Sequence, residues 1–123
     1  MAAANTFKNF KEILTNLLNS DNNIRSSAEL HYLEVPETDK VYHLLEVLGD
    51  NSSTEEAELA AVLLRKLISN SYNEVFSKLS PEVHEQIKTR LLHQLASNMN
   101  QSLKRKLCEV VSELARNCIG NIF

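Results

Sequence analysis

One cationic run, Lys104-Arg105-Lys106, is the densest group of side chains that could do chemistry in this sequence. Lysine and arginine attract phosphates and other anions without a fixed geometry, so the run is a candidate phosphate-binding or nuclear-localisation patch. Basic runs at the start of an amphipathic helix are more often a solvated face, and we favour that interpretation.

Histidine and cysteine are the next candidates, as metal ligands or nucleophiles. The four histidines are scattered along the chain, at His31, His43, His84 and His93. None makes an i, i+4 pair, and there is no adjacent cysteine couple, so we expect no zinc site. Cys108 and Cys118 are ten positions apart on one predicted helix, about 15 Å, which is too far for a disulfide. We expect both to be small core residues of a reducing compartment.

Phosphate loops and nucleophile motifs are missing from the sequence. Gly49 and Gly120 are its only glycines, and neither lies in a strand-loop-helix context. No serine or cysteine has a neighbouring base in a recognisable motif. We therefore expect no enzyme, no cofactor and no metal.

Composition predicts an all-α protein. The 123 residues, 43% apolar and 24% charged, suit one globular domain, while two glycines, two prolines and no tryptophan leave little material for strands and hairpin turns. The net charge of −3 argues against direct nucleic-acid binding. Apolar runs such as 41–48 and 59–64 are too short to span a membrane, and the N-terminus lacks a secretory signal, so we expect cytoplasm or nucleus.

Helical periodicity predicts three antiparallel hairpins in a single domain over 1–123, at approximately 6–35, 39–69 and 80–119. Pro36 should end the first hairpin, and Ser80-Pro81 is a specific helix start. We expect Gly49 in the left-handed position after a helix, Gly120 at the close of the last one, and an irregular segment over 70–79.

A repeat appears when the hairpins are compared. The corresponding positions Arg25, Ala57 and Lys104 are separated by 32 and 47 residues, about 40 on average, which is typical of HEAT and armadillo units. The pattern predicts an α-solenoid of about three HEAT-type hairpins. Such arrays are binding surfaces.

Several blocks resemble the N-terminal region of the karyopherin-β, or importin-β, superfamily. The most telling is Ala60-Ala61-Val62-Leu63-Leu64-Arg65-Lys66-Leu67. Within the superfamily the importin-5 group is most similar, on Met1-Ala2-Ala3-Ala4, Leu17-Leu18-Asn19-Ser20-Asp21-Asn22, and Cys108 to Asn117 ending in Glu113-Leu114-Ala115-Arg116-Asn117. Together the blocks cover nearly the whole chain.

The resemblance implies a nuclear transport receptor, acting in cytoplasm and nucleus, whose N-terminal repeats bind Ran-GTP. It implies that the second helix of each hairpin, here 24–35, 55–69 and 102–118, lines a concave surface. The candidate Ran contacts on that surface are Glu29, Arg65, Lys66, Glu113 and Arg116. Import cargo and nucleoporins would be partners as part of a longer chain.

Two alternatives remain open. One is a HEAT scaffold unrelated to transport, and the other is a truncated regulatory remnant without carrier activity. The chain is far shorter than a full receptor, and Ala57 stands where HEAT units often carry an arginine that links neighbouring repeats. Three hairpins bury little surface, so we expect marginal folding or self-association through an apolar end at Ile119, Ile122 and Phe123.

Overall fold

The computed structural model describes the backbone of residues 2–49, 54–97 and 100–122 and the side chains of 9–49, 54–97 and 100–117. This part of the chain is almost entirely helical. The elements are α1 (Ala2–Leu17), α2 (Asn22–Glu34), α3 (Glu37–Gly49), α4 (Thr54–Val75), the 3-10 helix η1 (Phe76–Lys78), α5 (Pro81–Ala96) and α6 (Gln101–Ile122). Those ranges hold no strand. The all-α prediction is confirmed.

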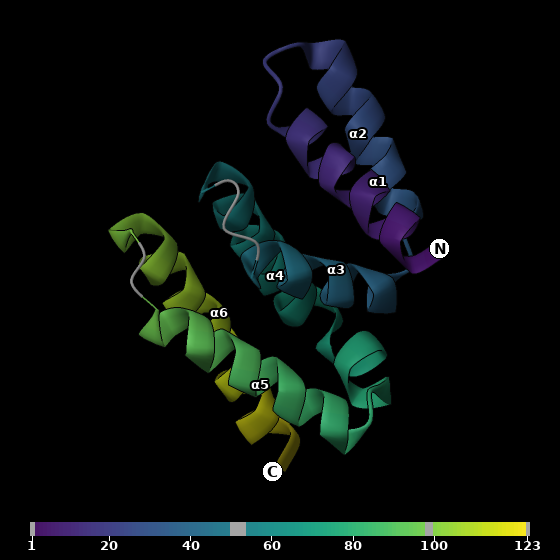
Figure 1. Ribbon diagram of the computed structural model, residues 1–123. Helices are drawn as coiled ribbons and strands as arrows, with labels where there is room; N and C mark the ends of the chain where they lie inside the picture. Colours follow the sequence, from purple (N-terminus) through teal and green to yellow (C-terminus); the bar gives the residue numbers. More distant parts are fainter. Residues whose placement is uncertain (1, 50–53, 98–99, 123) are drawn as a thin grey trace.

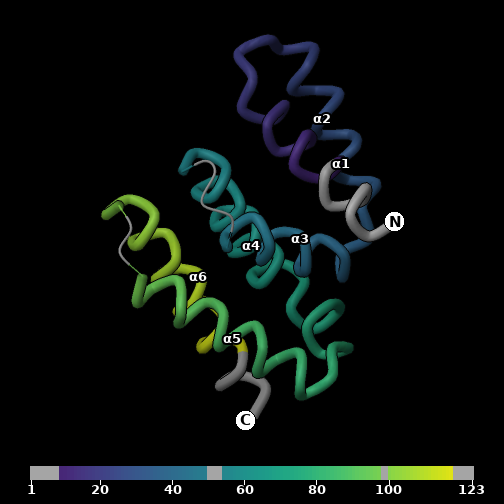
Figure 2. Tube along the Cα trace, viewed as in Figure 1, coloured from purple at the N-terminus to yellow at the C-terminus, as the bar shows by residue number. Residues whose placement is uncertain are grey.

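Consecutive helices pair as antiparallel hairpins, α1 with α2, α3 with α4, and α5 with α6 (Figure 1). The three hairpins follow one another through the array, with α3 and α4 in the middle (Figure 2). The predicted HEAT-type solenoid is therefore confirmed.

The turn between α1 and α2 is held from two sides. Asp21 caps α2, because its carboxylate accepts hydrogen bonds from the backbone amides of Asn23 at 2.8 Å and Ile24 at 3.3 Å. Arg25 reaches back and donates to the carbonyls of Asn19 and Ser20, both at 3.0 Å. Helix α2 then ends before Pro36, as predicted.

The predicted start signal at Ser80-Pro81 is confirmed. The Ser80 hydroxyl accepts from the Val83 amide at 3.3 Å, and Pro81 occupies the first turn of α5. Asn100 does the same for α6, where its side-chain oxygen accepts from the Leu103 amide at 2.8 Å. Ser53 and Glu56 have the sequence spacing of a capping box, but Ser53 lies outside the described residues.

Two expectations about helix ends are wrong, and a third is right only in part. The irregular segment expected over 70–79 is reduced to a kink inside α4 at Ser71 (φ −135°, ψ 24°) and the 3-10 turn η1, because α4 continues to Val75. The helix extends because it buries Tyr72 and Val75, and Tyr72 stacks on Phe76 with ring centroids 5.4 Å apart. Gly49 is the last residue of α3, with no positive φ, and α6 runs past Gly120 to Ile122.

One hydrophobic core runs through all three hairpins, from Phe10 on α1 to Leu114 on α6. Helix α4 is its centre, since it packs mainly against α3 and α6. Ala60 and Ala61 on α4 are almost completely buried, consistent with the close helix approach that small residues allow.

The first hairpin joins the others through α1. Phe10 is buried, with its ring centroid 6.1 Å from that of Tyr32 and 5.0 Å from that of His43. The Lys40 ammonium lies 4.4 Å from the centroid of the Tyr32 ring, a cation–π contact at a residue only 5% exposed. By contrast α2 packs mainly against α1 and makes few contacts with other helices.

Candidate partner-binding surface

Helices α4 and α6 form the most extensive contact between neighbouring hairpins. Both are second helices, which the sequence predicted to line one surface. Their exposed polar side chains, together with those of α2, make up the candidate surface. A polar network lies where the two helices meet.

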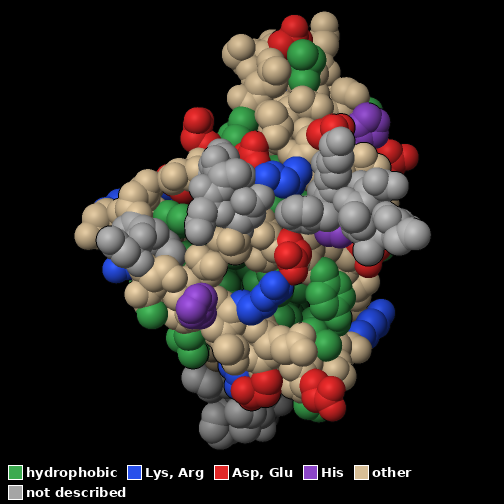
Figure 3. All heavy atoms as spheres, in the orientation of Figure 1, with side chains coloured by type: hydrophobic (Ala, Val, Ile, Leu, Met, Phe, Trp, Pro, Cys, Tyr) green, Lys and Arg blue, Asp and Glu red, His purple; other side chains and the backbone are tan. Residues whose placement is uncertain are grey.

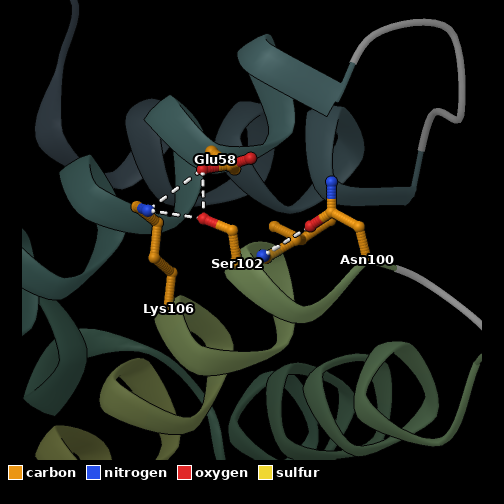
Figure 4. A network of polar contacts seen from close by, with 5 residues as sticks. Glu58, Asn100, Ser102 and Lys106 are labelled. Carbon is orange, nitrogen blue, oxygen red and sulfur yellow. Dashed lines mark hydrogen bonds and ion pairs between the residues drawn. The ribbon is translucent and has the colours of Figure 1, made fainter.

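The network joins Glu58 on α4 to Ser102 and Lys106 on α6 (Figure 4). One carboxylate oxygen of Glu58 accepts from the Ser102 hydroxyl at 2.9 Å and from the Lys106 ammonium at 3.0 Å. Lys106 also donates to the Ser102 oxygen at 3.1 Å, which closes the triangle. The Glu58 and Lys106 side chains are 24% and 33% exposed, so solvent screens the pair only in part.

These contacts change the acidity of Glu58. Hydrogen bonds from Lys106 and then Ser102 hold the pKa of the Glu58 carboxyl below its usual value of 4.5, because they stabilise the charged form. The carboxylate is therefore ionised at neutral pH. The missing arginine at Ala57 does not leave the repeats without a side-chain link, since Glu58, one position on, provides one.

This network also limits which cations of the basic run Lys104-Arg105-Lys106 are available to an anion. Lys106 is committed to Glu58, Lys104 is half-buried, and Arg105 is exposed. Arg105 is therefore the most exposed cation that the run offers to an anion. The sequence-based interpretation of this run as a solvated face therefore missed that Lys106 links the second and third hairpins.

Two of the predicted contacts, Arg65 and Lys66, are exposed on α4. Within the described part of the chain neither makes an ion pair or a hydrogen bond through its side chain. Arg65 is about two turns beyond Glu58, on nearly the same side of α4. Lys66, the next residue, lies about 100° further round the helix.

Glu113 and Arg116, also predicted, form a pair on α6. The Arg116 guanidinium donates to Glu113 at 3.0 Å, and the Asn117 amide donates to the other carboxylate oxygen at 3.3 Å. The Glu113 side chain is 11% exposed, whereas that of Arg116 is 71% exposed. Glu113 therefore positions Arg116, and the guanidinium is the group that a partner would meet.

Glu29 lies apart from the other four candidates. It is exposed on α2, a helix that makes few contacts with α4. The structure thus places Arg65 and Lys66 on α4 and Glu113 and Arg116 on α6, the two helices that meet at the seam, and Glu29 on α2, which makes few contacts with either. Spacing along the sequence did not distinguish the two groups.

A second surface feature lies between α3 and α5, which pack less closely than α4 and α6. Two adjoining hollows of about 380 and 560 Å³ share Thr89 and Arg90 in their walls. Arg90 crosses the seam to Glu46 at 2.8 Å. Figure 3 shows hydrophobic side chains in the same region, with acidic and basic groups interspersed.

Cys108 is exposed, so the prediction that it belongs to the core is wrong. The buried face of α6 carries Leu103, Leu107, Val110 and Leu114, and Cys108 lies outside that stripe. The side chains of Cys118 and of the apolar end at 119–123 lie outside the described residues.

Two searches for other kinds of site also apply to the described residues. They contain no group of three or more histidine, cysteine, aspartate or glutamate side chains placed to hold a metal ion. No helix among them has the length and apolarity needed to cross a membrane.

Stacked helical hairpins with an exposed, mixed-charge surface are typical of protein-binding arrays. The sequence matches the Importin-beta N-terminal domain over residues 29–97, more than half of the chain. The chain therefore belongs to that family, within the karyopherin-β superfamily. The predicted family resemblance is confirmed.

Solved structures of Kap121p have the same arrangement. The structure of Kap121p bound to RanGTP is 28% identical with a TM-score of 0.78, and that of Kap121p alone is 29% identical with a TM-score of 0.77. Kap121p bound to Ste12p gives 28% and 0.75. Each match covers 90% of this chain but only 11% of the Kap121p chain.

Proposed function

We propose that this chain is the N-terminal portion, or a short paralogue, of an importin-5-like nuclear transport receptor, and that it binds Ran-GTP in nuclear protein import. The observation that carries the proposal is its similarity over 90% of its length to Kap121p, a protein crystallised with RanGTP. In this proposal residues 1–123 act as one HEAT-repeat domain with no enzymatic role, in cytoplasm and nucleus.

The contacts that we propose are Arg65, Lys66 and Arg116, with Glu113 as the residue that positions Arg116, and Glu29 from the separate face of α2. Arg65 and Lys66 support this because they are exposed cations that form no ion pair within the described chain. Charges presented in this way steer association and discriminate between partners. Cargo and nucleoporins would bind a longer chain that includes these repeats.

Binding of the purified chain to Ran tests the proposal, with Ran loaded either with a non-hydrolysable GTP analogue or with GDP. We expect the GTP form to be selected, because nucleotide reorders the switch segments of a GTPase. The double substitution Arg65→Glu and Lys66→Glu should weaken binding to Ran about tenfold. The control is Lys78→Glu, a charge reversal at an exposed cation of η1, which should change the affinity little.

Each other outcome favours an alternative. Equal binding of both nucleotide forms would point to a HEAT scaffold unrelated to transport. A well-folded monomer that binds neither form would point to a remnant without carrier activity.

A further inference from the structure

Helix α2 presents an apolar stripe that no part of the described chain covers. Leu30 and Leu33 are 64% and 71% exposed, more than any other large hydrophobic side chain that the structure describes. On the opposite side of the helix Ala28 is buried against the rest of the hairpin. Figures 1 and 2 show the α1–α2 hairpin at one end of the array. The stripe therefore faces outward.

Carboxylates border this stripe on both sides. With about 100° of rotation per residue, Glu29 falls on one flank of Leu30 and Leu33, and Glu34 on the other. Both are exposed, and neither forms an ion pair or a hydrogen bond through its side chain within the described chain. Arg25, the arginine of this helix, is turned away to hold the loop carbonyls.

Glu34 is also poorly placed for the helix itself. It is the last residue of α2, where the helix dipole is negative and an anion is unfavourable. A cation brought by a partner would relieve that repulsion. Two exposed leucines between two unpaired carboxylates would be complementary, in polarity and in charge, to a partner helix whose apolar stripe is bordered by basic residues.

We propose that this face of α2, formed by Leu30 and Leu33 with Glu29 and Glu34 at its edges, docks an amphipathic helix of another protein whose leucine-like stripe is flanked by lysine or arginine. Helix-to-helix docking uses apolar anchors at i and i+3, the spacing of the two leucines. The proposal goes beyond Ran binding, with which it shares only Glu29, and its test below uses no Ran.

Charge argues against other occupants. The two carboxylates would repel the anionic surface of a membrane or a nucleic acid. A second copy of this chain would bring its own Glu29 and Glu34 against the same pair, since the edges of the stripe carry only negative charge. A basic amphipathic segment is the partner that satisfies both the stripe and its edges.

A fluorescent peptide of about 18 residues tests the proposal, because shorter isolated helices are marginal in water. Its leucine stripe is flanked by lysines, and a matched peptide has glutamates in their place. We expect saturable anisotropy binding of the lysine peptide, weakened by added salt, and little binding of the glutamate peptide. Ran is absent, so failure here would leave Ran binding untouched.

Substitutions then locate the binding face. Glu29→Lys with Glu34→Lys should weaken lysine-peptide binding about tenfold and create binding of the glutamate peptide. Leu33→Ser should weaken binding about tenfold as well. The matched controls are Glu109→Lys, at an exposed carboxylate of α6, and Leu92→Ser, at a leucine that is 57% exposed on α5; both should change affinity by less than about twofold.

Three results would overturn the proposal: no saturable binding, equal binding of both peptides, or binding that the α2 substitutions leave unchanged. Self-association that Leu33→Ser abolishes would overturn it too, because a second copy would then be the occupant. Circular dichroism accompanies each variant. If the Glu29→Lys and Glu34→Lys variant loses helicity, the proposal is judged instead by the salt dependence of lysine-peptide binding to the unaltered chain and by the effect of Leu33→Ser on that binding.

Discussion

Glu58 on α4 and Lys106 on α6, 48 positions apart in the sequence, form an ion pair of 3.0 Å across the seam between the second and third hairpins. Ser102 shares both groups. Since α4 and α6 make the largest contact between hairpins, this pair lies where the array is most firmly joined. Removing either partner leaves a partly buried charge without its counterion.

Glu58→Gln should lower the free energy of unfolding by about 1 kcal/mol, because it removes a charged hydrogen bond that solvent screens only partly. Urea denaturation measures the change. The matched control is Glu85→Gln, which breaks a 2.9 Å pair with Lys88 whose side chains are 70% and 53% exposed, and it should cost much less. Equal losses would mean that the seam pair contributes no more than a surface pair.

Acid should weaken the same pair. Because the folded-state pKa of Glu58 is below its usual 4.5, the pair contributes stability above that value and loses it as pH falls through the folded pKa. The difference in unfolding free energy between the unaltered chain and Glu58→Gln should therefore shrink on acidification, once pH is below 4.5. Urea curves at a series of pH values test this, and a constant difference would contradict it.

Tyr32 should limit stability in alkali. Burial, and then the charge of Glu37, raise the pKa of Tyr32 from 10.0 to about 12. The unfolded chain then ionises first, so stability should fall as pH rises from 10.0 toward 12. Tyr32→Phe keeps the ring beneath Lys40 and should show a smaller alkaline loss in thermal unfolding. Tyr42→Phe, at a ring 42% exposed, is the control and should follow the unaltered chain.

Leu64 should be among the most costly positions to truncate. It is completely buried on the central helix α4, so Leu64→Ala should cost about 2–5 kcal/mol through lost burial and a cavity. That loss is a large fraction of the stability of a small domain. Leu92→Ala removes the same atoms from an exposed position and should cost little. Denaturant melts of the two variants give the comparison.

Helix boundaries with a chemical signal were predictable from the sequence. Ser80-Pro81 starts α5 because a serine cap and a proline in the first turn are both local effects. Pro36 ends α2 for a similar reason. The extension of α4 past residue 69 was missed, since it depends on where Tyr72 and Phe76 are buried, which is a property of the assembled core.

The candidate surface was predictable only in outline. The spacing of 47 between Ala57 and Lys104 falls between the 44 and 48 positions that separate Glu58 from its partners, so the repeat indicated which turns face each other. It did not indicate that Lys106 points to Glu58 rather than to solvent, because side-chain direction follows the rotation of packed helices. The burial of Glu113 and the exposure of Cys108 escaped prediction for the same reason.

The second and third hairpins are fastened at two edges, Glu46 to Arg90 between α3 and α5 and Glu58 to Ser102 between α4 and α6, and both links span 44 positions. A hairpin linked to its neighbour along one edge can rotate about that edge, whereas a hairpin linked along two edges resists both rotation and torsion. Twisting the third hairpin against the second would pull one link apart while the other is compressed. Of the two links, the more buried Glu58 contact should therefore resist this twisting more than the half-exposed Glu46–Arg90 pair.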